Sequence, residues 1–352
     1  MSTILVTGGA GFVGSHTCVS LLEKGFKVIV VDSNINSSPI ALDRVEDILK
    51  IKHKSYEKIV FEKGDIRDEI FLRNIFNRAI KRYSEIKAVI HFAGLKSIRE
   101  SVLDPLSYWD SNLIGTLTLL KVMNDFNCKT IVFSSSASIY GNEVRTPIVE
   151  TSPIKPNNPY GKTKAAIEKI LHDLFISTSN REWRIANLRY FNPIGSHKTG
   201  LIGENPNNVP NNLFPLICGV AIGRYEKLNI YGNDWPTKDG TGVRDYIHVM
   251  DLAEGHLLVL ELLIKNKPQI LSMNLGTGSG TSVLELISVF EKINGVKIPY
   301  HFSKRREGDN AFVVADNNLA KSILNWEPRM SIQEMCRDGY LWQIKNPNGY
   351  LN

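Results

Sequence analysis

Tyr160 and Lys164 are four residues apart, and Ile167, Leu171 and Leu174 follow at helical spacing, so all five side chains fall on one helix face. A tyrosine has a pKa near 10, so at pH 7 about one molecule in a thousand is phenolate. Lys164 and a second cation, each within about 4 to 6 Å of the phenol, would each lower that pKa by about 1 to 3 units. The pair therefore indicates a general base for an alcohol. The alternative is an ordinary amphipathic helix whose lysine extends to solvent.

Two further segments favour catalysis over that alternative. Ser134, Ser135 and Ser136 end an apolar run, and Phe92-Ala93-Gly94 follows an earlier one. If both runs are parallel strands, their carboxyl ends lie at the sheet edge where ligands of open α/β folds bind. Ser136 would then hold a substrate oxygen while Tyr160 removes its proton.

A glycine-rich turn precedes the first helical pattern. Gly8, Gly11 and Gly14 permit a tight turn and close approach of a pyrophosphate to a helix N-terminus; the alternative is a plain turn that requires positive φ. Asp32 ends the second apolar run. Its separation from the glycine turn is close to that of the carboxylate that binds the ribose hydroxyls of a dinucleotide. Because this carboxylate repels a 2′-phosphate, the pattern predicts NAD rather than NADP.

Asp65 and Ile66 follow the third apolar run and have two interpretations. They lie at the adenine end of the cofactor, or Asp65 is a helix N-cap. The eight histidines show no metal-binding spacing, so no metal is predicted. His16 and His248 are interpreted as packed or capping residues.

The elements that position these residues alternate along the first half of the chain. Short β-branched runs are separated by helical patterns, for example at 40–52 and 70–82. Strands buried on both faces and joined by helices form a doubly wound parallel sheet. The sequence therefore predicts an α/β, Rossmann-like fold, with strands at 4–6, 28–31, 59–61, 88–90 and 130–133.

The second half is richer in proline, asparagine and glycine. It retains helical patterns at 250–264, 282–292 and 332–343 and a strand pattern at 271–274. This composition, together with the mixture of helix and strand patterns, predicts a smaller mixed α/β lobe. We expect a cofactor-binding domain at 1–192 and a substrate-binding lobe at 193–352, with some exchange of chain between them.

Composition excludes several classes. With 43% hydrophobic and 22% charged residues, the chain is not disordered. A net charge of +6 fits phosphorylated small molecules, nucleic acid or anionic membranes equally well; we expect no nucleic-acid partner. The longest apolar stretch is too short for a membrane span, and no secretion signal is evident. The four cysteines suit neither a disulfide framework nor a zinc site, which predicts reduced thiols and a cytoplasmic location.

Taken together, these motifs resemble the extended short-chain dehydrogenase/reductase family, and within it the UDP-hexose 4-epimerases. The resemblance extends over essentially all 352 residues. It implies reversible, NAD-dependent 4-epimerisation of UDP-glucose and UDP-galactose through a 4-keto intermediate. The matching motifs are at 8–16, 91–96, 134–137, 160–164, 188–193, 210–213, 231–234, 240–249 and 305–309.

The resemblance also implies roles for individual residues, with Ser136, Tyr160 and Lys164 as the catalytic residues. Cofactor contacts are expected from Gly8, Gly11, Phe12, Val13, Gly14, Asp32, Asn36, Ser37, Asp65, Ile66, Phe92, Ala93, Gly94, Lys96, Ser134, Tyr160, Lys164 and Phe191. Substrate contacts are expected from Lys96, Ser136, Tyr160, Asn192, Asn211, Asn212, Leu213, Asn229, Ile230, Tyr231, Arg244, Arg306, Asp309 and Val313.

Within these sets, the planar guanidinium groups of Arg244 and Arg306 suit a diphosphate. Asp309 is expected at the uridine ribose, and 229–231 at the uracil. The alternative for the two arginines is a solvated basic surface. Phe191 is expected beside the nicotinamide.

Two departures from the family pattern bear on specificity. Val313 stands where some members carry a bulky tyrosine, which predicts room for UDP-N-acetylglucosamine and UDP-N-acetylgalactosamine as well. Ser111 stands where some carry an asparagine near the cofactor, a change we expect to be tolerated. The family further implies a homodimer formed through Pro105 to Phe126 and Pro159 to Thr178.

Other functions remain open at this stage. A 4,6-dehydratase usually carries an Asp-Glu pair after the strand-five serine or threonine, where this chain reads Ala137-Ser138. A uronate 4-epimerase would use the same fold. A non-catalytic NAD-dependent binding protein is disfavoured because Ser136, Tyr160 and Lys164 are all present.

Overall fold

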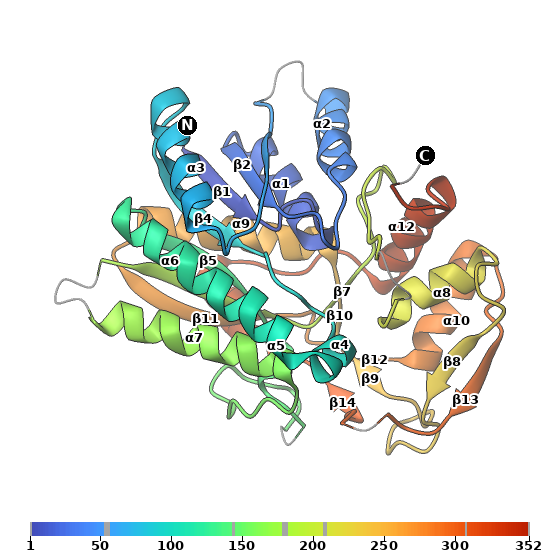
Figure 1. Ribbon diagram of the computed structural model, residues 1–352. Helices are drawn as coiled ribbons and strands as arrows, with labels where there is room; N and C mark the ends of the chain where they lie inside the picture. The colour runs from blue at the N-terminus through green and yellow to red at the C-terminus, as the bar shows by residue number, and fades with distance from the viewer. Residues whose placement is uncertain are drawn as a thin grey trace.

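The computed structural model describes residues 2–52, 57–142, 145–177, 182–206, 210–306 and 308–350 (Figure 1). A seven-stranded sheet of order β11-β6-β5-β4-β1-β2-β3 forms its centre. Every pairing in this sheet is parallel, which confirms the predicted doubly wound α/β fold. The strands are β1 (Thr3–Thr7), β2 (Lys27–Asp32), β3 (Val60–Lys63), β4 (Ile86–His91), β5 (Thr130–Ser136), β6 (Arg184–Tyr190) and β11 (Gln269–Leu275).

Helices cover both faces of the sheet. Because side chains alternate along a strand, Ile4 and Val6 of β1 pack into one apolar cluster and Leu5 into the opposite one. The first cluster lies under α1 (Phe12–Glu23), α2 (Ile40–Lys52) and α9 (Val249–Lys265). The second lies under α3 (Glu69–Arg82), α6 (Gly115–Asp125) and α7 (Pro159–Ser177). Burial on both sides explains why the strands read as continuous apolar runs.

The predicted elements match the observed ones closely. The helix expected at 40–52 has those bounds, and the one expected at 70–82 begins one residue earlier. The strand expected at 271–274 is β11, which pairs with β6 along its whole length at the edge of the large sheet. The helix expected at 250–264 is α9, which packs on the same sheet. Chain from after residue 193 thus completes the first lobe, and the division at 192/193 stays a prediction.

The smaller lobe has its own core, built around Phe214, Ile217, Ile230, Phe290 and Met335. It lies beside the carboxyl edge of the large sheet (Figure 1). Its helices are α8 (Leu213–Ala221), α10 (Val283–Asn294) and α12 (Ile332–Lys345). Its strands pair as β7 (Asn192–Ile194) with β10 (Tyr246–His248), β8 (Leu228–Tyr231) with β13 (Tyr300–Ser303), and β9 (Val243–Arg244) with β12 (Thr281–Ser282) and β14 (Phe312–Val313).

Short helical segments follow the loops at the carboxyl ends of β4 and β5. α4 (Ile98–Leu103) and α5 (Pro105–Tyr108) follow the loop after β4, and a π-helical turn at Trp109–Ile114, which contains Ser111, leads into α6. A 3₁₀ turn at Ala137–Ile139 follows β5, and α11 is Asn318–Leu324. No helix within the described ranges has the length and apolarity that a bilayer span requires.

Candidate active site

Tyr160 and Lys164 lie on the buried face of α7 together with Ile167 and Leu171. Tyr160 is 9% exposed and Lys164 4% exposed. The Lys164 Nζ donates to the carbonyl oxygen of Ser134 at 2.7 Å and lies 5.9 Å from the centroid of the Tyr160 ring. The ammonium group is therefore fixed between the end of β5 and the phenol.

The surroundings of Tyr160 act in opposite directions on its acidity. Burial raises the pKa of the phenol, while a hydrogen bond with Ser136 and the positive charge of Lys96 lower it. Burial also lowers the pKa of Lys164 to about 8, against the opposing charge of Glu168. Lys96 is thus the protein cation that lowers the pKa of Tyr160, a role the sequence did not reveal because Lys96 comes from a different loop.

The glycine turn passes tightly between the ends of β2 and β4. Gly8 has φ 72°, and a Cβ there would lie 2.6 Å from the amide nitrogen of Ala93. A Cβ on Gly14 would lie 2.3 Å from the Gly8 carbonyl oxygen, so α1 packs directly on the turn. Gly11 occupies the N-cap of α1, and no side chain caps that helix end, where Phe12 and Val13 form the first turn. These features suit the approach of a diphosphate to backbone N–H groups.

Asp32 is held at the carboxyl end of β2. Its Oδ2 accepts from the amide of Ala10 at 3.0 Å, and its Oδ1 accepts from the amide of Asn34 at 3.0 Å and from the hydroxyl of Ser37 at 2.8 Å. Asn36, in the same loop, is exposed. A carboxylate fixed beside the glycine turn fits the ribose of a bound dinucleotide.

The N-cap interpretation of Asp65 is wrong. Asp68 caps α3 by accepting from the amide of Phe71 at 2.9 Å. Asp65 instead pairs with Arg67 at 2.6 Å, and hydrogen bonds from Arg67 lower the pKa of its carboxyl group. Ile66 beside it is buried, and the adenine contact stays a prediction.

The loop after β4 links the two lobes. The amides of Phe92 and Ala93 donate to the Thr7 carbonyl oxygen at 2.9 and 3.1 Å, which ties the loop to the glycine turn. Lys96 forms an ion pair with Glu204 at 2.8 Å. A second contact between the lobes lies next to it, where the side-chain amide of Asn211 donates to the Ser97 hydroxyl at 3.2 Å. The surrounding protein disfavours the charge of Lys96, but Glu204 outweighs this and raises the pKa of Lys96.

The predicted uracil residues lie on β8. Ile230 is buried, and the Oδ1 of Asn229 is buried without a hydrogen-bond partner among the described residues. The Arg306 guanidinium carbon lies 3.8 Å from the centroid of the Tyr231 ring. A cavity of about 410 Å³ adjoins this end of the lobe, lined by residues 232–234 and 302–305. It does not reach Tyr160, so it marks neither the reacting centre nor the cofactor site.

Arg244 and Asp309 are held together. The Arg244 Nη1 donates to the carbonyl oxygens of Val243 and Asn310, at 3.0 and 2.8 Å. Its Nη2 lies 3.4 Å from Asp309 Oδ1. Arg244 pairs in register with Val313 across β9 and β14, so these three predicted residues form one group.

Val313 connects that group to the reacting end. It packs against an apolar cluster that includes Ile139, Tyr140 and Phe191, with Ala137 also at its margin. Asn192 follows Phe191, and its side-chain amide donates to the Asp245 carbonyl oxygen at 3.3 Å. Asn212 is the N-cap position of α8 without a capping side-chain bond, and Leu213 begins that helix.

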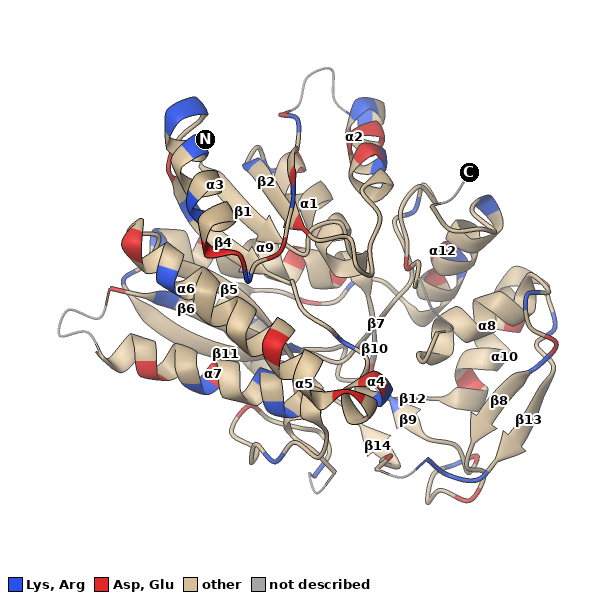
Figure 2. Ribbon diagram, in the orientation of Figure 1, with Lys and Arg blue, Asp and Glu red and all other residues tan. Residues whose placement is uncertain are grey.

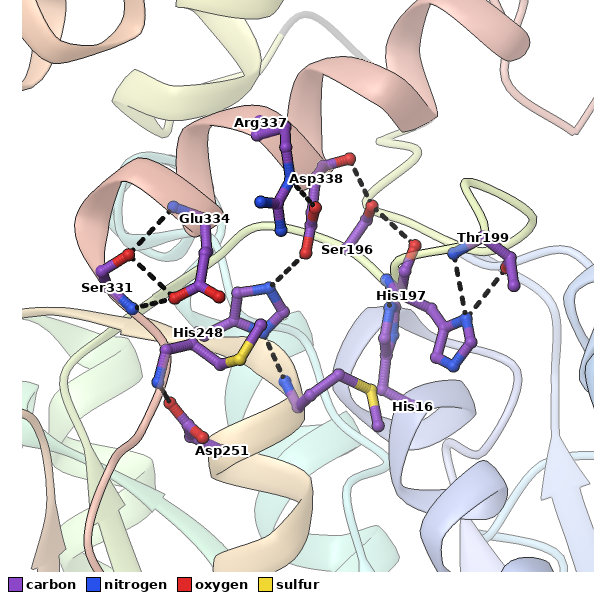
Figure 3. Close-up of polar contacts among 12 residues, drawn as sticks. His16, Ser196, His197, Thr199, His248, Asp251, Ser331, Glu334, Arg337 and Asp338 are labelled. Carbon is purple, nitrogen blue, oxygen red and sulfur yellow. Dashed lines mark hydrogen bonds and ion pairs between the residues drawn. The ribbon is translucent and has the colours of Figure 1, made fainter. Parts of the chain in front are cut away.

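His16 and His248 are structural, as predicted (Figure 3). His248 caps α9, since its Nδ1 accepts from the Met250 amide at 3.0 Å, and its Nε2 lies 3.4 Å from Asp338 Oδ2. The Nε2 of His16, at the start of α1, accepts from the His197 amide at 3.1 Å. These contacts join α9 to α12, and α1 to the loop that follows β7.

Comparisons with known proteins agree with this geometry. A family profile described as GDP-mannose 4,6 dehydratase matches residues 5–339. The chain is 50% identical over 347 residues to a UDP-glucose 4-epimerase of Bacillus subtilis (strain 168), covering 99% of this chain and 98% of that protein. It is 49% identical over 348 residues to UDP-glucose 4-epimerase 2 of Arabidopsis thaliana, covering 99% and 97%.

Solved structures show the same likeness. The UDP-glucose 4-epimerase of Stenotrophomonas maltophila, with bound NAD and formylated UDP-arabinopyranose, has a TM-score of 0.93 at 43% identity, covering 99% of each chain. The UDP-glucose 4-epimerase of Bifidobacterium longum, in complex with NAD+ and UDP, has a TM-score of 0.91 at 46% identity, covering 99% of this chain and 100% of that one.

Proposed function

The chain belongs to the UDP-glucose 4-epimerases of the extended short-chain dehydrogenase/reductase family, and from this premise we propose how its residues carry out the reaction. The reaction is the reversible, NAD-dependent epimerisation of UDP-glucose and UDP-galactose at C4. One observation carries the proposed roles: Lys164, Ser136 and Tyr160 meet at the carboxyl edge of the sheet, next to the loop that contacts the glycine turn.

The residues of the first lobe fit NAD. A Cβ on Gly11 would meet only the Gly8 carbonyl oxygen, at 3.3 Å, so the protein leaves the turn open on that side. We assign Asp32 to a ribose, the first turn of α1 to the diphosphate, and Phe191 to the nicotinamide side of the site. Bound NAD supplies the hydride acceptor for the sugar C4 and later the hydride donor.

Tyr160 acts as the general base in the first half-reaction and as the general acid in the second. Its phenolate takes the proton of the sugar 4-hydroxyl while Ser136 holds the same oxygen. Lys164 and Lys96 stabilise the phenolate electrostatically. Between the two halves the 4-keto sugar turns over and presents its other face, so the net redox change is zero.

The second lobe anchors the nucleotide while the sugar turns. Asn229 offers a buried amide oxygen in need of a donor, which suits the N–H of a uracil. Arg244 and Arg306 suit the diphosphate, and Asp309 suits a ribose hydroxyl. Binding energy from the UDP end then positions a loosely held sugar.

The direct test is turnover. Purified protein incubated with UDP-galactose should form UDP-glucose, followed by NMR of the anomeric signals, and NAD should be identified in the denatured protein. The absence of UDP-glucose in the presence of added NAD would contradict the proposed roles of Tyr160, Lys164 and Ser136.

We also propose that the sugar site accepts N-acetylated UDP-hexoses. The support is Val313, a small side chain that packs against the apolar cluster containing Ile139, Tyr140 and Phe191, at the expected place of the sugar. The same NMR assay with UDP-N-acetylglucosamine tests this directly, and a rate below detection would contradict it.

We propose a homodimer formed through α5–α6 and α7. Leu103 and Leu106, on α4 and α5, are 75% and 78% exposed, and Val102 and Ile114 in the same stretch of chain are also exposed. Several large exposed apolar side chains within one short stretch favour an interface there. Thr178, at the end of the second predicted segment, lies outside the described residues. A Leu106→Asp variant should elute as a monomer in size-exclusion chromatography with light scattering, whereas the parent elutes as a dimer.

We further propose a cytoplasmic protein without a nucleic-acid partner. All four cysteines are buried and unpaired, as in proteins of reducing compartments. Acidic and basic residues are interspersed along α2, α6 and α7 (Figure 2), whereas nucleic-acid binding usually requires a clustered basic surface.

A further inference from the structure

Glu168 continues the row that Tyr160 and Lys164 begin on α7. It lies one helical turn beyond Lys164 and is as buried as the other two. The reaction described above uses Tyr160 and Lys164 but assigns nothing to this carboxylate. A buried carboxylate is costly unless it is paired.

Its partner is Arg189 on β6. The Arg189 Nη2 donates to Glu168 Oε2 at 2.6 Å, and its Nε donates to Oε1 and Oε2 at 3.0 and 3.2 Å. The two side chains are only 5% and 6% exposed. Arg189 is fixed in turn by the Tyr140 hydroxyl at 3.0 Å and the Glu150 carbonyl oxygen at 2.8 Å.

Glu168 also holds β5. The Ser135 hydroxyl donates to Glu168 Oε1 at 2.5 Å, and Ser135 pairs in register with Arg189. Ser135 stands between Ser134, whose carbonyl oxygen accepts from Lys164, and the catalytic Ser136. The carboxylate therefore fixes the peptide from which both catalytic contacts arise.

Few other charges face Lys164. On β4, burial and the charge of Lys164 lower the pKa of His91 to about 3, so this histidine is neutral near pH 7. On β6, burial raises the pKa of Tyr190, which is therefore neutral too. Arg189 adds a positive charge behind Glu168. Glu168 remains the anion that favours the charged form of Lys164.

We propose that Glu168, held by Arg189 and Ser135, is a positioning residue that keeps Lys164 an ammonium ion in contact with the end of β5. The proposal rests on the proposed function of Tyr160 and Lys164. It assigns a task in the epimerase reaction to a side chain that does not contact the substrate.

The direction of the effect follows from the charges. Burial lowers the pKa of Lys164 to about 8 even with Glu168 present. A group whose charged form is required loses activity as the pH rises through its pKa. Removing the Glu168 charge lowers the pKa of Lys164 further, so the alkaline limb of the activity profile moves toward lower pH.

The test compares Glu168→Gln with the parent as holoenzymes across a pH series. We expect the midpoint of the alkaline limb of kcat to fall by about one pH unit, with KM for UDP-galactose unchanged. NMR of lysine Nζ-labelled protein, with the Lys164 signal assigned by its loss in Lys164→Met, should show the same downward shift. Turnover by the parent tests the proposed function separately.

Glu150→Gln is the matched control. Glu150 Oε1 accepts from the Asn274 amide at 2.8 Å in the same polar network, but this carboxylate is not among the groups acting on Lys164. Its pH profile should match that of the parent even if its thermal midpoint falls. A Glu168→Gln profile that matches the parent, or an equal shift in both variants, overturns the proposal.

Glu168→Gln leaves Arg189 buried without a counter-charge and so risks misfolding. The Glu168→Gln/Arg189→Met double variant avoids this, because neutral replacements of a buried ion pair are often tolerated. Its alkaline limb should also move to lower pH, by less than in Glu168→Gln, because the more distant opposing charge of Arg189 is lost together with the carboxylate. An unmoved limb in this folded variant overturns the proposal as well.

Discussion

The two ends of the proposed active site are built in different ways. At the sheet edge, Tyr160, Lys164 and Ser136 are buried, and Lys164 is fixed to the backbone of β5. At the nucleotide end, Arg244 and Arg306 lie on short strands and loops. Arg244 pairs with Asp309, and Arg306 stacks on the Tyr231 ring. The contrast indicates that proton transfer requires fixed geometry, whereas the nucleotide site has partners that a ligand can replace.

The largest effect should come from the fixed end. Tyr160→Phe removes the only proposed proton acceptor and should lower kcat by about 10²- to 10⁴-fold, with a smaller change in KM. Steady-state assays with UDP-galactose measure it. Tyr300→Phe, on the exposed face of β13, is the matched control and should behave as the parent. Equal kcat for Tyr160→Phe and the parent would remove the contrast between the two ends.

An intermediate effect is expected at the nucleotide end. Arg244→Ala removes a charge-assisted contact with the diphosphate and should raise KM by about 10- to 100-fold, with kcat reduced less. Arg329→Ala, an exposed arginine near Glu254, should leave KM unchanged. A loss confined to kcat would mean that Arg244 acts at the reacting centre and not as an anchor.

The smallest effect on turnover is expected at Val313, which lies between the Arg244–Asp309 pair and the cluster that contains Phe191. Val313→Tyr adds a ring at the margin of the apolar cluster that contains Phe191 and should lower kcat/KM for UDP-N-acetylglucosamine by about 10-fold or more. The rate with UDP-galactose, measured on the same enzyme, is the internal control and should stay within about 3-fold. Equal losses with both sugars would show that the ring damages packing and does not select the substrate.

The sequence predicts the fixed end better than the nucleotide end. Tyr160, Lys164 and the glycine turn depend on spacing within one element, and helical periodicity or strand alternation is sufficient to place them. The bounds of α2 and the burial of β1 follow from the same local rules.

Other features arise only from tertiary contacts. The contact of Lys96 with Glu204, 108 residues later, has no local signal, and neither does the pairing of Arg189 with Glu168 across two elements. β6 was not predicted as a strand, although its residues were recognised as part of a motif. The N-cap alternative for Asp65 also fails, since Asp68 and not Asp65 accepts from the amide of Phe71.

The return of the chain to the large sheet after residue 193 has a practical consequence for protein engineering. A fragment that stopped at residue 192 would expose the outer edge of β6 and uncover the sheet face on which α9 packs. We therefore expect a fragment of residues 1–192 to aggregate or unfold when expressed alone. A chimaera that exchanges nucleotide specificity between relatives must keep α9, β11 and α11 with the N-terminal parent, and graft only the smaller-lobe segments that lie before α9 and after β11.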